Sequence, residues 1–167
     1  QYRQHGLPLG VVKRMDQLAS NTATFPRSRA QVLRDKVEVR LAVNEAGPMI
    51  YEILKANGIA LEADWSKVFP HWLIATADDD VIGCCQVVMS KPVGYVEFLF
   101  VHPKAPFKFR AIALRKLGYQ AMGTLHHSGC QYVAGMVSTK NKKFFDVIEK
   151  MKFSKIDTAN LVVRKLS

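Results

Sequence analysis

Residues 94–122 read GYVEFLFVHPKAPFKFRAIALRKLGYQAM, and this stretch decides the fold that we expect for the chain. It begins with an apolar run, Tyr95 to Val101, whose aromatic and β-branched residues are typical of a buried strand. Proline lacks an N–H group and restricts the residue before it, so the strand must end at His102-Pro103. Apolar residues then recur at roughly helical spacing, which predicts a helix from about Arg110 to His127.

The start of this predicted helix has the composition of an anion-binding site. It carries two cations, Lys108 and Arg110, beside the small residues Ala111 and Ala113. The free backbone N–H groups and the positive dipole end of a helix attract phosphates, and small residues let a phosphate approach closely. The sequence therefore predicts phosphate binding where the strand passes into the helix.

The composition is that of one ordinary globular domain. The chain has 167 residues, of which 49% are hydrophobic and 23% charged. It contains no apolar run of about 18 residues, so we expect no membrane span. Three cysteines, Cys84, Cys85 and Cys130, are too few for a disulfide framework. We expect them to be reduced core thiols in a cytoplasmic protein, and we expect no metal role for them or for the Asp78-Asp79-Asp80 turn.

The net charge of +10 is unevenly distributed along the chain. Residues 38–103 carry four Lys or Arg against nine acidic residues, whereas residues 104–167 carry thirteen against three. Three interpretations stay open: the C-terminal half binds a small polyanion, the protein binds nucleic acid, or the basic surface is simply solvated.

The remaining patterns predict a mixed α+β domain. Residues 1–36 hold too few large apolar residues for a core, so we interpret them as a basic N-terminal arm or helical preface to a domain spanning residues 37–167. Apolar runs predict strands over residues 37–43, 71–76, 81–89, 131–138, 153–156 and 160–165. Helical periodicity predicts helices over residues 44–57, 62–69 and 141–151. The first of these has Asn44 as its cap and an apolar face formed by Met49, Ile50, Ile53 and Leu54. The element order is then β-α-α-β-β-β-α-β-α-β-β.

This order, together with residues 94–122, resembles the GNAT family of acetyl-CoA-dependent N-acyltransferases over about residues 37–166. Family members carry the motif Q/R-x-x-G-x-G/A after their fourth strand, and Lys108-Phe109-Arg110-Ala111-Ile112-Ala113 is similar to it, with Lys and Ala in place of Arg and Gly. A later family helix reads N-x6-Y-E-K-L-G-F, and this chain has Asn141 followed by Ile148-Glu149-Lys150-Met151-Lys152-Phe153 in that register. The chain departs from the family at Ile148 and Lys152, where the tyrosine and the glycine would stand.

The resemblance implies a GNAT, or acyl-CoA N-acyltransferase, fold with a mixed central sheet, and acetyl-CoA or CoA as cofactor. Backbone groups near Leu99 and Val101 would bind the pantetheine arm in a gap between two strands and polarise the thioester carbonyl. The backbone N–H groups of residues 109–113, together with Lys108 and Arg110, would hold the pyrophosphate. The cofactor-binding candidates are Leu99, Val101, Lys108, Phe109, Arg110, Ala111, Ile112, Ala113 and Asn141.

Glu97 is the candidate general base. An ammonium group must lose a proton before it can attack a thioester, and a carboxylate in so apolar a strand is partly desolvated, which strengthens it as a base. Its position resembles the catalytic glutamate of the histone-acetylating branch of the family. The alternative is a glutamate that reaches solvent or pairs with a lysine. Because Ile148 has no proton to give, the leaving thiolate would be protonated by Tyr132, Ser138 or water.

Two functions of different classes remain open. The first is an N-acetyltransferase that moves an acetyl group from acetyl-CoA to an unknown amine acceptor. The second is a catalytically degenerate GNAT-fold protein, structural or associated with nucleic acid, of a phage virion or DNA-modification type and located in the virion or host cytoplasm. Ile148, the glycine-free loop and the basic arm favour the second function. A regulator that binds CoA without turnover is a third reading.

Overall fold

The computed structural model describes residues 28–61, 63–66, 71–136, 148–150, 152–155 and 161–165. Its helical elements are α2 (Arg29–Asp35), the 3-10 turn η1 (Asn44–Ala46), α3 (Gly47–Ala56) and α4 (Phe107–His127). Its strands are β1 (Val37–Leu41), β2 (Trp72–Ala77), β3 (Asp80–Ser90), β4 (Val93–Val101), β5 (Tyr132–Met136), β6 (Ser154–Lys155) and β7 (Leu161–Lys165).

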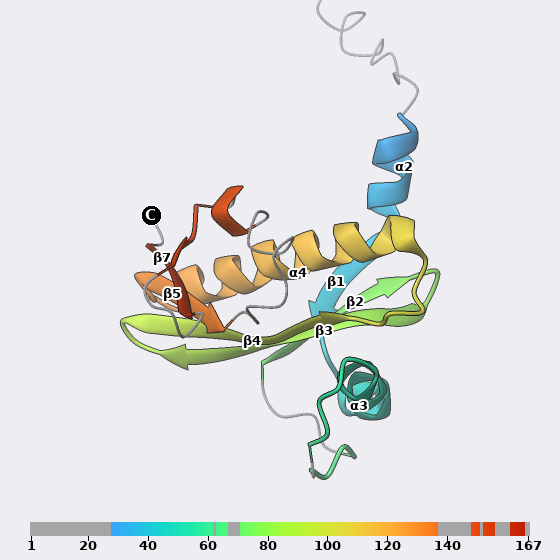
Figure 1. Cartoon of the computed structure of the whole chain (residues 1–167), viewed down its shortest axis with the longest axis horizontal. Helices are drawn as coiled ribbons and strands as arrows, with labels where there is room; N and C mark the ends of the chain where they lie inside the picture. The colour runs from blue at the N-terminus through green and yellow to red at the C-terminus, as the bar shows by residue number, and fades with distance from the viewer. Residues whose placement is uncertain are drawn as a thin grey trace, which may run out of the picture.

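The strands form one mixed sheet in the order β1-β2-β3-β4-β5-β7-β6. β4 and β5 run parallel, and the other described strand pairs are antiparallel. Figure 1 shows α4 along one face of the sheet and α3 on the opposite face. The predicted α+β architecture is therefore confirmed. Among the described residues, no helix is both long enough and apolar enough to cross a bilayer.

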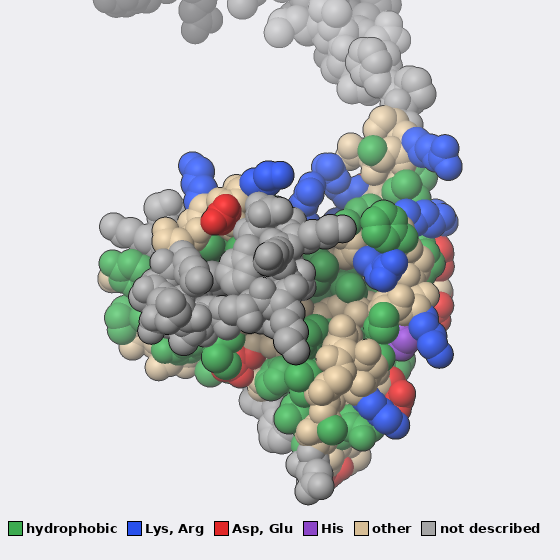
Figure 2. Space-filling model, viewed as in Figure 1, with side chains coloured by type: hydrophobic (Ala, Val, Ile, Leu, Met, Phe, Trp, Pro, Cys, Tyr) green, Lys and Arg blue, Asp and Glu red, His purple; other side chains and the backbone are tan. Residues whose placement is uncertain are grey.

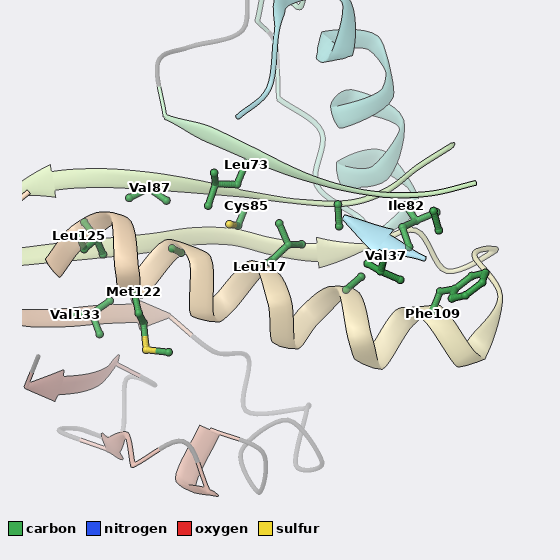
Figure 3. Close-up of a cluster of buried hydrophobic side chains, with 14 of the residues drawn as sticks. Val37, Leu73, Ile82, Cys85, Val87, Phe109, Leu117, Met122, Leu125 and Val133 are labelled. Carbon is green, nitrogen blue, oxygen red and sulfur yellow. The ribbon is translucent and has the colours of Figure 1, made fainter. Parts of the chain in front are cut away.

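Each face of the sheet has its own hydrophobic core. On the α4 face, buried residues such as Ala113, Leu117 and Leu125 pack against β1, β2 and β3, and Figure 3 shows Leu117 and Leu125 turned toward the strands. On the α3 face, the buried side chains are Ala46, Ile50, Ile53, Leu54, Trp72, Ile74 and Cys84. Adjacent strand residues point to opposite faces, and accordingly Cys85 belongs to the α4 core while Cys84 belongs to the α3 core.

The helix predicted over residues 44–57 is present, but it begins differently. A 3-10 turn starts at Asn44, and the residue that caps α3 is Ala46. Ile50, Ile53 and Leu54 are buried as predicted, whereas Met49 is 42% exposed. Met49 lies about 90° around the helix from the centre of that buried stripe, so its predicted burial is wrong.

The helix predicted over residues 62–69 is absent where the structure describes this segment, at residues 63–66. There the carboxylate of Asp64 accepts hydrogen bonds from the backbone N–H of Ser66, at 3.0 Å, and from its hydroxyl, at 2.5 Å. Such local side-chain bonds compete with helical hydrogen bonding, which explains the turn. Residues 62 and 67–70 lie outside the described residues.

The C-terminal predictions are confirmed where the structure describes the chain. Residues 132–136, 154–155 and 161–165 form strands, and residues 148–150 are helical. Residues 137–147, which include the candidates Ser138 and Asn141, lie outside the described residues.

Candidate functional site

The parallel pairing of β4 and β5 stops halfway along β4. The two strands pair from Val93 opposite Tyr132 to Val96 opposite Gly135, and β5 ends at Met136. β4 continues to Val101, so no described strand pairs with this side of residues 97–101. We call this unpaired side the open edge of β4.

A β-bulge lies at the beginning of the open edge. On β3, Gln86 pairs with Glu97 and Cys84 with Phe100, so Cys85 alone faces both Phe98 and Leu99. Phe98 has φ of 51°, a left-handed conformation that is uncommon for a bulky side chain. Bulges change the direction of a strand and interrupt its pairing. This one turns β4 at the point where its pairing with β5 has ended.

Backbone hydrogen-bonding groups of β4 point into the open edge. The N–H of His102 donates to the carbonyl of Ile82 on the β3 side, at 2.8 Å. Because backbone groups alternate in direction along an antiparallel strand, those of Leu99 and Val101 point away from β3. The carbonyl of Val101 accepts a hydrogen bond from the side-chain amide of Asn57, at 3.1 Å. Three backbone groups still point into the space beside the open edge, which we call the gap. They are the N–H groups of Leu99 and Val101 and the carbonyl of Leu99.

The helix α4 begins immediately beyond this strand, at Phe107, one turn earlier than the predicted start at about Arg110. The carbonyl of Pro106 accepts from the backbone N–H groups of Phe109 and Arg110, at 2.9 and 3.3 Å, which closes the first turn. These two N–H groups are therefore engaged within the helix. Among the described residues, the N–H groups of Phe107 and Lys108 have no acceptor, as expected for the start of a helix.

The first turn of α4 is basic and contains no acidic residue. Arg110 donates from Nη1 to the carbonyl of Pro103, at 3.3 Å, and its guanidinium lies 5.2 Å from the ring centroid of Phe107. The Nε atom of Arg110 is buried without a hydrogen-bond partner among the described residues. Lys108 is exposed, and its Nζ lies 4.9 Å from the ring centroid of Phe109. Both predicted cations thus lie at the positive end of the helix.

The other predicted residues of this helix differ in their surroundings. Phe109 and Ala113 are buried in the core, at 4% and 0% exposure, whereas Ala111 is exposed and Ile112 is half-buried. The side chain of Ala113 therefore packs against the sheet and cannot contact a ligand at the start of the helix.

Glu97 lies at the mouth of the gap, directly after the last β4–β5 pair. Its neighbour Val96 packs on the α4 face, so Glu97 projects from the α3 face, and its side chain is half-buried. Within the described residues, no basic side chain forms an ion pair with it.

Glu97 belongs to a row of three residues across neighbouring strands. Gln86 pairs with Glu97 on one side and with Trp72 on the other. Trp72 stacks on Phe98 with ring centroids 5.8 Å apart, and its indole Nε1 is buried without a hydrogen-bond partner among the described residues. Sequence reasoning did not select Gln86, although its polarity within the apolar run of β3 was a usable signal.

Tyr132, a candidate for protonating the leaving thiolate, does not meet this site. Tyr132 pairs with Val93 at the end of β4 and β5 where the two strands are paired, which we call the closed end. It lies about 10 Å along β5 from Gly135, the last residue of β5 that pairs with β4. His126 and His127 end α4, where Nδ1 of His127 donates to the carbonyl of Gly123 at 2.7 Å. Ile148 is 6% exposed and has no titratable group. Among the described residues, no three His, Cys, Asp or Glu side chains form a cluster that could hold a metal ion.

The site therefore combines a strand pair that opens, a bulged strand with free backbone groups, and a basic helix start. No family model matches the chain, and no curated protein matches it in sequence. Solved structures do match. An acetyltransferase of the GNAT family from Staphylococcus aureus superimposes with a TM-score of 0.64 and 10% identity, over 78% of this chain and 99% of that one.

Two further matches have coenzyme A in their structures. The PaiA N-acetyltransferase from Thermoplasma acidophilum, in complex with coenzyme A, has a TM-score of 0.63 and 17% identity, over 78% of this chain and 99% of that chain. N-acetylglutamate synthase from Neisseria gonorrhoeae, in complex with coenzyme A and L-arginine, has a TM-score of 0.62 and 17% identity, over 78% of this chain. The match spans 33% of the gonococcal protein, about a third of its length. The chain has the fold of the GNAT acetyltransferases.

Proposed function

We propose that this chain is an acyl-CoA-dependent N-acyltransferase that moves an acetyl group from acetyl-CoA to an amine. The observation that carries the proposal is the open edge of β4, where the N–H groups of Leu99 and Val101 point into a gap beside the start of α4. An extended, amide-containing ligand can pair with such an edge as a strand would. The structural neighbours with coenzyme A in their crystals support this choice of ligand.

The parts of acetyl-CoA match the groups that surround the gap. The pantetheine amides pair with Leu99 and Val101. The pyrophosphate lies against the N–H groups of Phe107 and Lys108 at the positive end of α4, with the side chains of Lys108 and Arg110 beside it. This arrangement places the phosphates at the first turn of the helix instead of along residues 109–113.

Glu97 accepts the proton that the attacking ammonium must lose. The amine nitrogen then bonds to the thioester carbon, the carbon–sulfur bond breaks, and the thiolate of CoA leaves. Water protonates this thiolate, because Ile148 is apolar and Tyr132 lies at the closed end of the strands. The acceptor approaches on the α3 face, where Glu97 projects near Gln86, Trp72 and Phe98.

Calorimetric titration with acetyl-CoA tests the binding step. We expect saturable binding that Lys108→Glu weakens about tenfold or more, because the substitution places a like charge beside the phosphates. Lys55→Glu, at an exposed position on α3, is the matched control and leaves the affinity unchanged. An absence of binding at high micromolar acetyl-CoA would overturn the proposal.

A specific observation favours a second function, a catalytically degenerate protein of this fold that binds nucleic acid. Figure 2 shows Lys and Arg side chains gathered along the side of the molecule that carries α2 and α4. Exposed cations on these helices include Arg29, Arg34, Lys108 and Arg115. Buried Ile148 in the position of the family tyrosine also supports a loss of activity. In this case the basic surface binds a nucleic acid backbone instead of a small polyanion.

A further inference from the structure

We propose that the acceptor of this chain is an arylalkylamine, a single amine joined by a short carbon chain to an uncharged aromatic ring, and that it binds on the α3 face beside Glu97. The inference rests on the proposed function and names the substrate class that this function leaves open. Its evidence is the set of side chains around Glu97, which strand register and the bulge at Phe98 bring to one face of the sheet.

The bulge places a carboxylate and an aromatic ring side by side. Val96 packs in the α4 core, so Glu97 points to the α3 face by ordinary alternation. In a regular strand Phe98 would return to the α4 face, but it packs in the α3 core and stacks on Trp72, with ring centroids 5.8 Å apart. Glu97 and Phe98 are both half-buried, so each keeps an accessible part. A ligand on this face meets the carboxylate and the ring together.

The other side chains around Glu97 on this face are uncharged. Val87 and Val133 belong to the α4 core. By alternation, the α3 face of β3 and β5 therefore carries Gln86, Val88, Tyr132, Ala134 and Met136. Tyr95 lies two residues before Glu97 on β4 and shares its face. Figure 1 shows α3 at the opposite end of this face from β5.

This surface is open beside the proposed base. Met136 follows Gly135, the β5 partner of Val96, just as Glu97 follows Val96, so Met136 and Glu97 are neighbours at the mouth of the gap. Met136 is 81% exposed and Tyr95 is 36% exposed. An exposed apolar surface beside a polar group is typical of a ligand-binding site.

The charge of this surface selects a monoamine. Among the described residues of β3 from Cys84 onward, of β4 and of β5, Glu97 is the only charged residue on the α3 face. One carboxylate attracts one ammonium group. A second ammonium would lose water against apolar side chains without a counter-charge, and a carboxylate on the ligand would be repelled by Glu97. The face therefore disfavours diamines and amino acids as acceptors.

The aromatic part of the acceptor matches a series of ring contacts that ends at Phe98. The series joins Tyr51 to Trp65, Trp65 to Trp72 and Trp72 to Phe98, with ring centroids 5.8, 6.1 and 5.8 Å apart. An acceptor ring against the accessible part of Phe98 continues this series, and Met136 offers a thioether that also packs well against rings. Because Phe98 directly follows Glu97, the chain between ring and amine must be short.

Calorimetric titration of the chain saturated with CoA tests the inference. The probe is 2-phenylethylamine. Putrescine, which has a second amine, and L-phenylalanine, which adds a carboxylate to the same skeleton, are the comparison ligands. We expect 2-phenylethylamine to bind at least about tenfold more tightly than either, and kcat/KM for thiol release from acetyl-CoA should rank the three amines in the same order.

Two results would overturn the acceptor class. They are equal or tighter binding of putrescine or L-phenylalanine, and an absence of 2-phenylethylamine binding to the CoA-loaded chain. Neither result affects the binding of acetyl-CoA. A chain that does not bind acetyl-CoA overturns the proposed function and the acceptor class together, so the two failures are distinguishable.

A charge variant tests the location of the acceptor. Met136→Glu adds a second carboxylate beside Glu97 and should raise the affinity for putrescine relative to 2-phenylethylamine about tenfold. Met89→Glu makes the same change at an exposed position on the α4 face, opposite Gly94, and should leave this ratio unchanged. Far-UV circular dichroism verifies that both variants are folded. An unchanged ratio in Met136→Glu, or equal shifts in the two variants, would overturn the inference, because the acceptor would then bind elsewhere.

Discussion

The side-chain amide of Asn57 donates to the carbonyl of Val101, at 3.1 Å, and so ties the C-terminal end of α3 to the last residue of β4. The same nitrogen donates to the carbonyl of Ile53 within α3, at 2.8 Å. Asn57 thus occupies one backbone acceptor of the open edge and leaves the N–H of Val101 directed into the gap. The helix on one face of the sheet thereby holds the strand end from which the candidate ligand site is built.

Replacing this amide should loosen the end of β4. Asn57→Asp puts a carboxylate against two carbonyl oxygens, so we expect the free energy of unfolding to fall by about 1–3 kcal/mol. Urea titration measures the loss. Gln120→Glu makes the same chemical change at an exposed position on α4 and should alter the free energy by less than about 0.5 kcal/mol. Equal effects of the two substitutions would contradict a supporting role for Asn57.

The proposed base can be tested without loss of shape. Glu97→Gln keeps the size of the side chain but cannot accept the proton, so kcat/KM should fall by about 10²–10⁴ while the affinity for acetyl-CoA stays nearly unchanged. Thiol release with an accepted amine measures the rate. Glu52→Gln, at an exposed position on α3, should leave the rate unchanged. An unaffected rate in Glu97→Gln would remove this residue from the mechanism.

Two glycines in helices should respond in opposite ways to the same substitution. A methyl group on Gly47 would overlap the backbone carbonyl of Trp65, whereas one on Gly123 would meet no atom within 4 Å. Gly47→Ala should therefore destabilise the fold by about 1–3 kcal/mol or more, because backbone must move. Gly123→Ala should stabilise it by up to about 1 kcal/mol, because alanine favours the helix. Thermal unfolding followed by circular dichroism distinguishes the two outcomes.

The buried thiols should make stability fall at alkaline pH. Desolvation raises the pKa of the Cys85 thiol to about 12, and desolvation together with the neighbouring Cys85 also raises the pKa of the Cys84 thiol. Thiols in the unfolded chain ionise near pH 8.5. The stabilisation that each neutral, buried thiol contributes to the fold is fully present below that pH. It is lost as the pH rises toward the pKa of the thiol in the folded chain, by up to about 1.4 kcal/mol per pH unit for each thiol.

Urea titrations under reducing conditions between pH 7 and pH 11 measure this dependence. In Cys84→Ala/Cys85→Ala the decline above about pH 8.5 should be shallower, even though the double variant is less stable at neutral pH. Parallel curves for the two proteins would contradict the role of these thiols.

Nucleic acid binding, if it is the function, should depend strongly on salt. The logarithm of the affinity for duplex DNA should fall linearly with the logarithm of the salt concentration, and Arg29→Glu/Arg34→Glu on α2 should make the slope shallower by up to about two. Lys55→Glu, on α3, is the charge-matched control for each of the single variants Arg29→Glu and Arg34→Glu. Deleting residues 1–36 should weaken binding further. A flat response to salt would count against this function.

Much of the fold could be predicted because hydrophobic periodicity is a local signal. The apolar run at Tyr95–Val101 and the helical spacing after Pro106 lead to β4 and α4 without knowledge of the remaining chain. The predictions failed where local hydrogen bonds compete, as at Asp64 and Ser66, and where a helix start depends on one carbonyl, as at Pro106.

The sequence by itself determined which residues form the strand and the basic helix start, and it singled out Glu97, Lys108 and Arg110 as chemically suited to a site. Tertiary structure alone decided where the β4–β5 pairing ends, that the chain bulges at Phe98, and that Asn57 contacts Val101. Strand register and cross-element hydrogen bonds join residues far apart in the chain, and neither composition nor periodicity encodes such pairs. The proposed roles of the site residues stay predictions that the experiments above can test.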